Sequence, residues 1–168
     1  MNQQDITNFI RHELRDKLRV DMQALRMVKE ADVECSIYFH LRKFLGENSN
    51  WRLLARKHAP ATGHYIDLIL FKHDTPVIAI EIKWGKRRIP DKDRASLEKA
   101  IDNLKVQKAY WISMTLDESS QRAPERSTGD QYRLFQIVIP LGLTGEKKKE
   151  WINMRRKFRR DMKEGKNV

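Results

Sequence analysis

Two neighbouring apolar segments of this 168-residue chain contain ionisable residues at positions where a buried β-strand would have none. The first segment, from Tyr65 to Phe71, contains Asp67, and the second, from Pro76 to Trp84, contains Glu81 and Lys83. Removing an unpaired carboxylate or ammonium from water costs several kcal/mol, so charges inside strands are normally paired with one another or with a metal ion. These three residues therefore constrain both the fold and the chemistry of the chain.

The two segments are predicted to form an antiparallel hairpin. Pro76 suits the start of the second strand, because proline has no N–H to give to a neighbouring strand. A three-residue loop at 73–75 would place Asp67 opposite Glu81, on the same face of the sheet. A two-residue loop would instead place Asp67 opposite Ile80 and the two carboxylates on opposite faces. We favour the three-residue loop, and with it a shared face.

On that register the three charges form one cluster. Directly opposed side chains lie about 5 Å apart, where two carboxylates repel each other unless a cation lies between them. Lys83 is two residues after Glu81 and projects from the same face, about 7 Å along the strand. The simpler alternative is a strand-end ion pair that emerges into solvent. Two other Glu-x-Lys tripeptides, at 146–148 and 164–166, lie in polar stretches and suit that alternative.

The arrangement resembles the PD-(D/E)xK superfamily, which has the restriction-endonuclease-like fold. The superfamily signature is an Asp on one strand and Glu/Asp-x-Lys on the next, and Ile66 stands here where a proline often precedes the Asp. The resemblance implies that Asp67 and Glu81 bind Mg²⁺ or Mn²⁺ together with the main-chain carbonyl of Ile82. It also implies that Lys83 orients the attacking water or stabilises the negative charge that develops on phosphorus.

Members of the superfamily usually carry a helix before these strands, with a Glu that faces the site. The segment from Ala31 to Leu41 matches this pattern, and Glu34 lies on the flank of the helix that would face the sheet. Glu34 would bind a second ion or a metal-bound water, although a surface Glu at the margin of an amphipathic helix is the simpler alternative. Apolar residues at helical spacing support the helix itself: Val33, Ile37, Leu41, Phe44 and Leu45.

The remaining periodicities predict an α/β fold with a central mixed sheet flanked by helices. The resemblance covers about residues 30–115, an αβββαβ core, within a single domain of residues 1–168. The other expected elements are a helix after Asp5, strands over 51–56, 109–114 and 132–140, a helix over 91–107, an exposed loop over 117–131, and a basic helix from about Lys147.

The chain is strongly basic, with 34 Lys or Arg against 23 Asp or Glu and a net charge of +11. Residues 145–168 contribute +6 of this charge, which favours phosphate backbones as partners. In the terminal helix, Trp151, Met154 and Phe158 would dock against the body of the protein. A basic helix that merely aids solubility is the alternative. Docking would leave four arginines exposed for nucleic acid: Arg155, Arg156, Arg159 and Arg160.

A second basic segment, Lys86, Arg87 and Arg88, directly follows the charged strand. A substrate phosphate that reached the carboxylates would pass this loop, so we expect these side chains to contact the nucleic-acid backbone. Trp84, at the strand end, could stack on a base or pack in the core, and we favour the core.

These observations predict a Mg²⁺- or Mn²⁺-dependent nuclease with Asp67, Glu81, Lys83 and Glu34 in its active site, acting on DNA rather than RNA. A non-catalytic nucleic-acid-binding or regulatory protein that keeps the fold is the alternative. A homodimer is plausible only because many members of the superfamily cut two strands. Cys35 is the single cysteine, which excludes an internal disulfide, and no apolar stretch approaches the roughly 20 residues of a membrane span. We therefore expect a cytoplasmic protein with no membrane partner.

Overall fold

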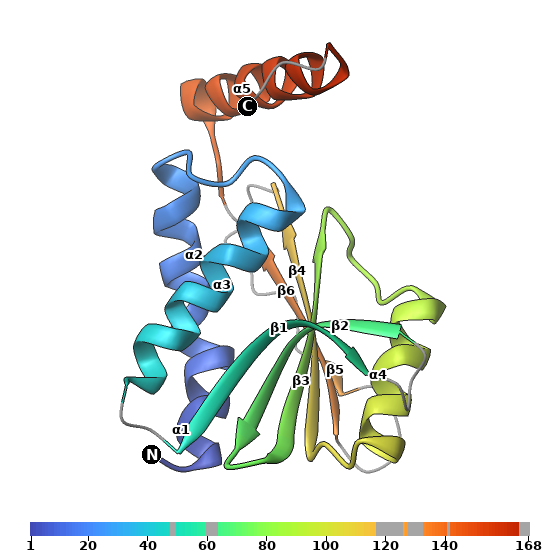
Figure 1. Cartoon of the computed structure of the whole chain (residues 1–168). Helices are drawn as coiled ribbons and strands as arrows, with labels where there is room; N and C mark the ends of the chain where they lie inside the picture. The colour runs from blue at the N-terminus through green and yellow to red at the C-terminus, as the bar shows by residue number, and fades with distance from the viewer. Residues whose placement is uncertain (48–49, 60–63, 117–125, 128–132, 141, 165–168) are drawn as a thin grey trace.

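The computed structural model describes residues 1–47, 50–59, 64–116, 126–127, 133–140 and 142–164. A mixed β-sheet lies at the centre with helices against both faces (Figure 1), which confirms the predicted α/β class. In chain order the elements are α1 (Gln3–Asn8), a π-helical turn η1 (Phe9–Glu13), α2 (Leu14–Gln23), α3 (Glu30–Leu45), β1 (Trp51–Ala59), β2 (His64–Lys72), β3 (Thr75–Trp84), α4 (Asp91–Asn103), β4 (Lys108–Thr115), β5 (Arg126–Ser127), β6 (Leu134–Pro140) and α5 (Gly145–Lys163).

The described strands form a six-stranded sheet in the order β1-β2-β3-β4-β6-β5. Strands β1, β2 and β3 are antiparallel neighbours, whereas β3, β4 and β6 run parallel to one another. Helix α4 makes the crossover that parallel neighbours such as β3 and β4 require. Most of the predicted loop over 117–131 lies outside the described residues, but Arg126–Ser127 pair with β6 as a short antiparallel strand.

The loop between β2 and β3 is shorter than predicted. Lys72 pairs with Thr75, so only His73 and Asp74 lie between the strands, and the expected loop over 73–75 is wrong. His73 has a φ of 55°, the left-handed conformation that two-residue hairpin turns commonly need. Such a turn alone would have placed the acidic residues of the two strands on opposite faces.

A β-bulge next to this turn restores the expected register. The register shifts beside Val77, which adds one residue to β3. Beyond the bulge Leu68 pairs with Ile80, and this is the register in which Asp67 stands opposite Glu81. Turn and bulge together therefore give the alignment that a three-residue loop would have given.

The sheet separates two apolar clusters. Helices α1 to α3 cover one face and α4 covers the other, as Figure 1 shows. Every apolar residue predicted for the opening helix is at most 1% exposed: Ile6, Phe9, Ile10, Leu14 and Leu18. The predicted stripe of α3 is buried at Val33, Ile37, Leu41 and Leu45. Burial of these stripes fixes the rotation of α3 about its axis, and with it the direction of its acidic residues.

A buried polar cluster joins α3 to α2. Asp21 is 8% exposed and accepts hydrogen bonds from the Ser36 hydroxyl, from His40 Nε2 at 2.8 Å and from Arg26 Nη1 at 3.1 Å. Burial alone would raise the pKa of Asp21, but the hydrogen bonds from Ser36 and His40 lower it below its ordinary value. The charged carboxylate is therefore the stable form, and it holds α3 at a fixed position along α2.

Helix α5 lies at the top of the view in Figure 1, next to the chain between α2 and α3. Trp151 anchors it: the side chain is 2% exposed and its Nε1 donates a hydrogen bond to the Met27 carbonyl at 2.7 Å. Lys29 lies over the Phe158 ring, 4.8 Å from its centre. Trp151 and Phe158 therefore both lie on the predicted docking side of the helix. None of the helices in the described part of the chain is long and apolar enough to cross a membrane.

Candidate functional site

The site forms where β2 and β3 separate. The pairing of these strands ends before Asp67 and Glu81, while β3 continues beside β4 as far as Trp84. Acidic side chains take over the hydrogen bonds along the exposed edge of β3. Asp67 Oδ2 accepts from the Ile82 N–H at 2.7 Å, and Glu30 Oε2 accepts from the Trp84 N–H at 3.0 Å. At this edge of β3, carboxylates therefore accept the backbone N–H groups that a neighbouring strand would otherwise pair with.

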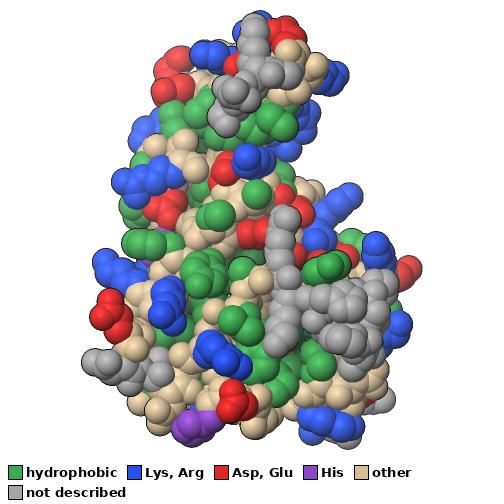
Figure 2. All heavy atoms as spheres, viewed as in Figure 1, with side chains coloured by type: hydrophobic (Ala, Val, Ile, Leu, Met, Phe, Trp, Pro, Cys, Tyr) green, Lys and Arg blue, Asp and Glu red, His purple; other side chains and the backbone are tan. Residues whose placement is uncertain are grey.

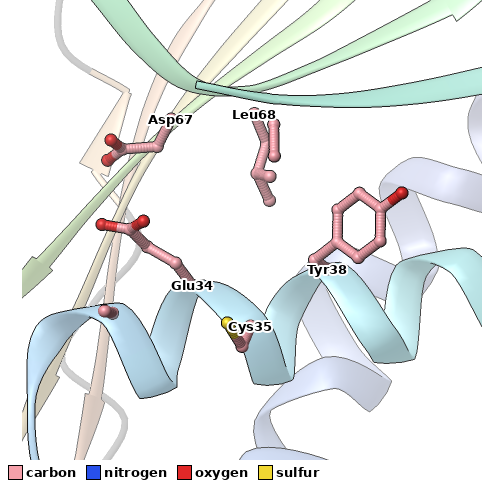
Figure 3. Close-up of a pocket in the computed structure, with 7 residues that line it drawn as sticks. Glu34, Cys35, Tyr38, Asp67 and Leu68 are labelled. Carbon is pink, nitrogen blue, oxygen red and sulfur yellow. The ribbon is translucent and has the colours of Figure 1, made fainter. Parts of the chain in front are cut away.

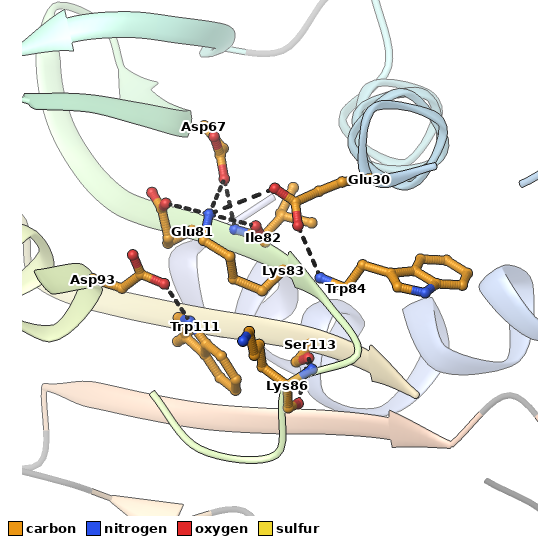
Figure 4. Close-up of polar contacts among 10 residues, drawn as sticks. All are labelled: Glu30, Asp67, Glu81, Ile82, Lys83, Trp84, Lys86, Asp93, Trp111 and Ser113. Carbon is orange, nitrogen blue, oxygen red and sulfur yellow. Dashed lines mark hydrogen bonds and ion pairs between the residues drawn. The ribbon is translucent and has the colours of Figure 1, made fainter. Parts of the chain in front are cut away.

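The ammonium of Lys83 lies at the centre of these acidic groups, as Figure 4 shows. Its Nζ is 2.7 Å from Glu81 Oε1 and donates a hydrogen bond to the Ile82 carbonyl at 2.9 Å. It also lies 3.9 Å from Asp67 Oδ2 and 3.8 Å from Glu30 Oε1. The structure thus brings together the three charges that the sequence placed on two strands, and adds a fourth from α3.

Glu81 is the most perturbed acid of the cluster. The residue is 8% exposed, and its second oxygen, Oε2, is buried without a hydrogen-bond partner among the described residues. Burial and the negative charge of Asp67 raise the pKa of Glu81 to about 7, even though Lys83 favours the ionised form. Near neutral pH this carboxyl is therefore poised between its two protonation states.

Burial acts on both Lys83 and Asp67, and their neighbours oppose it. Burial favours the neutral amine of Lys83, but the hydrogen bond and charge of Glu81 raise the lysine pKa above its usual value. Burial also raises the pKa of Asp67, against the Ile82 N–H and the charge of Lys83. At neutral pH Lys83 is consequently an ammonium group that can donate protons in hydrogen bonds but cannot act as a base.

The raised pKa of Glu81 predicts that stability depends on pH. An unfolded chain ionises this carboxyl near 4.5 and the folded protein near 7, so between these values the folded state holds more protons. The free energy of unfolding should fall as pH rises through this window, by roughly 2–4 kcal/mol in all. Denaturant unfolding measured across the window checks this, with Glu81→Gln as the variant that should flatten the slope. An unchanged slope in Glu81→Gln would contradict the assignment.

Glu34 approaches the same place from the helix side. Figure 3 shows its carboxylate turned toward that of Asp67, and both line one pocket between α3 and the sheet. Burial is the main cause of the raised pKa of Asp67, and the charges of Glu34 and Glu30 add to it. Glu34 therefore faces the carboxylates of the strands, as the sequence predicted, and not open solvent alone.

Glu30 is the member of the cluster that sequence reasoning missed. It is the first residue of α3 and lies one turn before Glu34 on the same side of the helix. An acidic residue in the first turn is also what the helix dipole favours, so its position suggested nothing beyond helix stability. The four-residue spacing from Glu34 was the signal that could have revealed it.

The basic loop after β3 has a fixed backbone and exposed side chains. Ser113 Oγ accepts from the Lys86 N–H at 3.3 Å and donates to the Lys86 carbonyl at 2.6 Å. Gln136 donates to the Arg87 carbonyl at 2.7 Å. The side chains of Lys86, Arg87 and Arg88 remain exposed beside the site. Contact of these side chains with a nucleic-acid backbone stays a prediction.

The basic face of α5 is smaller than predicted. Arg155 lies over the rings of Trp84 and Trp151, 5.7 and 5.1 Å from their centres, and is partly buried. The expectation that Arg155 is exposed is wrong, because its guanidinium stacks on the aromatic pair; burial lowers its pKa. Trp84 packs against Trp151 with ring centres 5.6 Å apart, in agreement with the core interpretation. On the face shown in Figure 2, Lys and Arg side chains lie along α5 with Asp and Glu side chains among them. Three predicted arginines stay exposed: Arg156, Arg159 and Arg160.

The donor set of the cluster fits a hard divalent cation. Asp67 and Glu81 offer carboxylate oxygens, and the Ile82 carbonyl, which now accepts from Lys83, points to the same place. The buried Oε2 of Glu81 is an acceptor to which no group in the described part of the chain donates. Oxygen ligands alone suit Mg²⁺ or Mn²⁺ better than Zn²⁺. In the described ranges no group of three or more His, Cys, Asp or Glu side chains is arranged to hold a metal, so side chains alone do not form a metal site here.

Comparison with known proteins adds little to this description. No protein-family model matches the sequence, and no curated protein matches it. A similar solved structure comes from an assembly of Thermococcus gammatolerans McrB AAA+ hexamers with bound McrC, with a TM-score of 0.47 and 18% identity. The match covers 78% of this chain and 33% of that chain, so this chain spans about a third of the length of its match. Similarity of this degree identifies neither a family nor an activity.

Proposed function

We propose that this chain is a metal-dependent phosphodiesterase that cleaves nucleic acid, with DNA as its substrate. One observation carries the proposal: the buried carboxylate of Glu81, the partly buried carboxylate of Asp67, a main-chain carbonyl and an ammonium meet at an unpaired strand edge. A desolvated cluster that raises the pKa of a carboxyl to about 7 is costly to maintain, and such perturbed groups concentrate at functional sites. The resemblance of Asp67 and Glu81-Ile82-Lys83 to the PD-(D/E)xK signature supports the same reaction class.

In this proposal Asp67, Glu81 and the Ile82 carbonyl hold Mg²⁺ or Mn²⁺. The bound ion would polarise the scissile phosphate and lower the pKa of an attacking water. Glu34 would bind a second ion or a metal-bound water from the helix side. Because Glu81 has a pKa of about 7, it must lose its proton before it can serve as a ligand, which makes metal affinity fall at acidic pH.

Lys83 would donate hydrogen bonds to the phosphate oxygens on which negative charge develops. Its raised pKa supports this role, because an ammonium group can stabilise that charge whereas a neutral amine is needed for a base. Glu30 would position Lys83: its carboxylate lies 3.8 Å from Nζ and is itself held by the Trp84 N–H. The helix and the strand thus fix the lysine from two sides.

The exposed cations supply an interaction with the nucleic-acid backbone that does not depend on sequence. Lys86, Arg87 and Arg88 follow the cluster directly in the chain, and α5 adds the exposed Arg156, Arg159 and Arg160. Phosphate contacts release counterions, so binding through these residues should weaken steeply as salt concentration rises. Affinity would come from these surfaces, and cleavage from the acidic cluster.

A non-catalytic nucleic-acid-binding protein is the second candidate. The observation in its favour is the 2.7 Å contact between Lys83 and Glu81, which neutralises the buried acid without any metal. On that interpretation the cluster would be a structural tie between strand and helix. The two candidates differ in whether the protein binds divalent cations and cuts phosphodiester bonds.

Cleavage by the wild-type chain separates them. The full chain is incubated with linear, supercoiled, branched and single-stranded DNA and with RNA, in Mg²⁺, in Mn²⁺ and in a chelator. We expect strand breaks that require the metal and appear on DNA. Binding to these substrates with no cleavage of any of them, in either metal, would reject the nuclease and favour the second candidate.

A further inference from the structure

A pocket of about 390 Å³ lies between α3 and the sheet, next to the acidic cluster. Its volume is within the range of pockets that hold small molecules or single groups of a larger ligand. Figure 3 shows Tyr38 and Cys35 on the helix side and Leu68 on the sheet side, with the Glu34 and Asp67 carboxylates at one end. Ala31 and Ala55 complete the lining. The pocket is therefore apolar along its walls and acidic at one end.

This combination of surfaces restricts what the pocket can bind. None of the described residues that line the pocket is cationic and its walls are apolar, so a charged sugar–phosphate backbone does not suit the interior. An aromatic side chain and aliphatic walls suit a flat ring, because ring faces are apolar and stack on tyrosine. Carboxylate oxygens accept hydrogen bonds from the amino groups at the edge of adenine, cytosine or guanine. A nucleobase satisfies all three conditions.

The pocket is also continuous with the proposed site of cleavage. Asp67 belongs to both: its carboxylate lines the pocket with Glu34 and accepts the Ile82 N–H of the metal-binding edge. A nucleotide whose phosphate lies at this edge could place its own base or a neighbouring base in the pocket only if that base leaves the stack. Unpaired bases leave the stack at the lowest cost.

We propose that this pocket receives one unstacked nucleobase beside the phosphate to be cut, and that it directs the protein to DNA with unpaired nucleotides. The inference rests on the proposed function and deepens it, because it names the class of DNA structure. Bulges, flaps, junctions and single strands would bind with a base in the pocket. A fully paired duplex would bind through the basic surfaces alone.

Cys35 makes a direct test available, because it is the only cysteine of the chain, is exposed and lines the pocket. The rate of Cys35 alkylation by N-ethylmaleimide is measured in a chelator, which removes the divalent cations that the proposed cleavage requires, at saturating concentrations of two oligonucleotide duplexes. One duplex is fully paired and the other carries a single bulged adenine. Saturation of each is confirmed by fluorescence anisotropy.

We expect the bulged duplex to slow alkylation about tenfold more than the paired duplex, as base stacking in a pocket should give. Equal rates with the two saturating duplexes would overturn the proposal, whether or not the protein cleaves DNA. Absence of cleavage in the separate substrate panel would reject the nuclease function alone, so the two failures are distinguishable. Free adenosine is tested as a third ligand. Protection of Cys35 by the nucleoside alone would identify the base as the recognised group. Lack of protection by adenosine, with protection by the bulged duplex, would show that the base is recognised only within a strand.

A variant that fills the pocket provides the matched comparison. Ala55→Phe should abolish the preference for bulged over paired duplex in anisotropy and leave affinity for the paired duplex unchanged. Val20→Phe is the control, because Val20 is 62% exposed on α2 and does not line the pocket. A preference that survives in folded Ala55→Phe would overturn the proposal. If Ala55→Phe does not fold, the alkylation rates of the wild-type chain decide the question without it.

Discussion

Lys83→Ala is expected to lower the rate of metal-dependent cleavage by a factor on the order of 100–1,000, the usual effect of removing one donor that stabilises transition-state charge. In the folded protein this ammonium contacts Glu81 and the Ile82 carbonyl and remains protonated at neutral pH. The variant keeps the oxygen ligands, so it should still bind Mn²⁺. Single-turnover cleavage and metal titration of the same preparation separate the two effects.

Glu81→Ala provides the contrast, because it removes a ligand and should eliminate cleavage and metal binding together. Lys86→Ala is the control for lost positive charge: its side chain is exposed on the neighbouring loop and should affect only nucleic-acid binding, modestly and in a salt-dependent way. Cleavage by Lys83→Ala within about threefold of wild type would remove Lys83 from the chemistry, since such a factor is below 1 kcal/mol.

Trp151→Ala is expected to lower the free energy of unfolding by about 3–5 kcal/mol, the usual cost of deleting a buried tryptophan side chain. The ring is 2% exposed, stacks on Trp84, and lies beneath the guanidinium of Arg155. Its loss would also leave the Met27 carbonyl without the donor it now has in Trp151 Nε1. Urea unfolding followed by circular dichroism measures this change without relying on tryptophan fluorescence.

Met162→Ala is the matched control on the same helix, because Met162 is 58% exposed and should change stability by less than about 0.5 kcal/mol. A loss below about 1 kcal/mol in Trp151→Ala would mean that the docking of α5 contributes little to the fold. In that case the exposed arginines of α5 would have no fixed position relative to the acidic cluster, and their proposed role in binding would have to be revised.

The charged cluster could be predicted from the sequence because its pattern violates the apolar character of the strands that contain it. Loop length could not be predicted in the same way. A two-residue turn followed by a bulge at Val77 gives the same alignment as a three-residue loop, and a valine inside a strand gives no signal of a bulge. The alignment of Asp67 with Glu81 was therefore reached through an incorrect loop.

Interactions that depend on tertiary contacts could not be predicted from the sequence. Glu30 joins the cluster because β2 and β3 separate and leave the Trp84 N–H without a strand partner, and strand separation leaves no local pattern. Helical spacing predicted that Arg155 is exposed, but its guanidinium lies over the Trp84 ring from β3. Helical spacing identifies which side of α5 docks, whereas the neighbour that covers that side depends on the whole fold.

Calorimetric titration of Mn²⁺ tests most directly the central claim that Asp67 and Glu81 form one divalent-cation site. Wild-type protein is titrated at a pH above 7, where Glu81 is ionised, beside Asp67→Ala and the control Asp16→Ala, whose side chain is 65% exposed on α2. We predict saturable binding to wild type and to Asp16→Ala, and none to Asp67→Ala. Absence of binding to wild type, or equal binding to Asp67→Ala, would contradict the metal site.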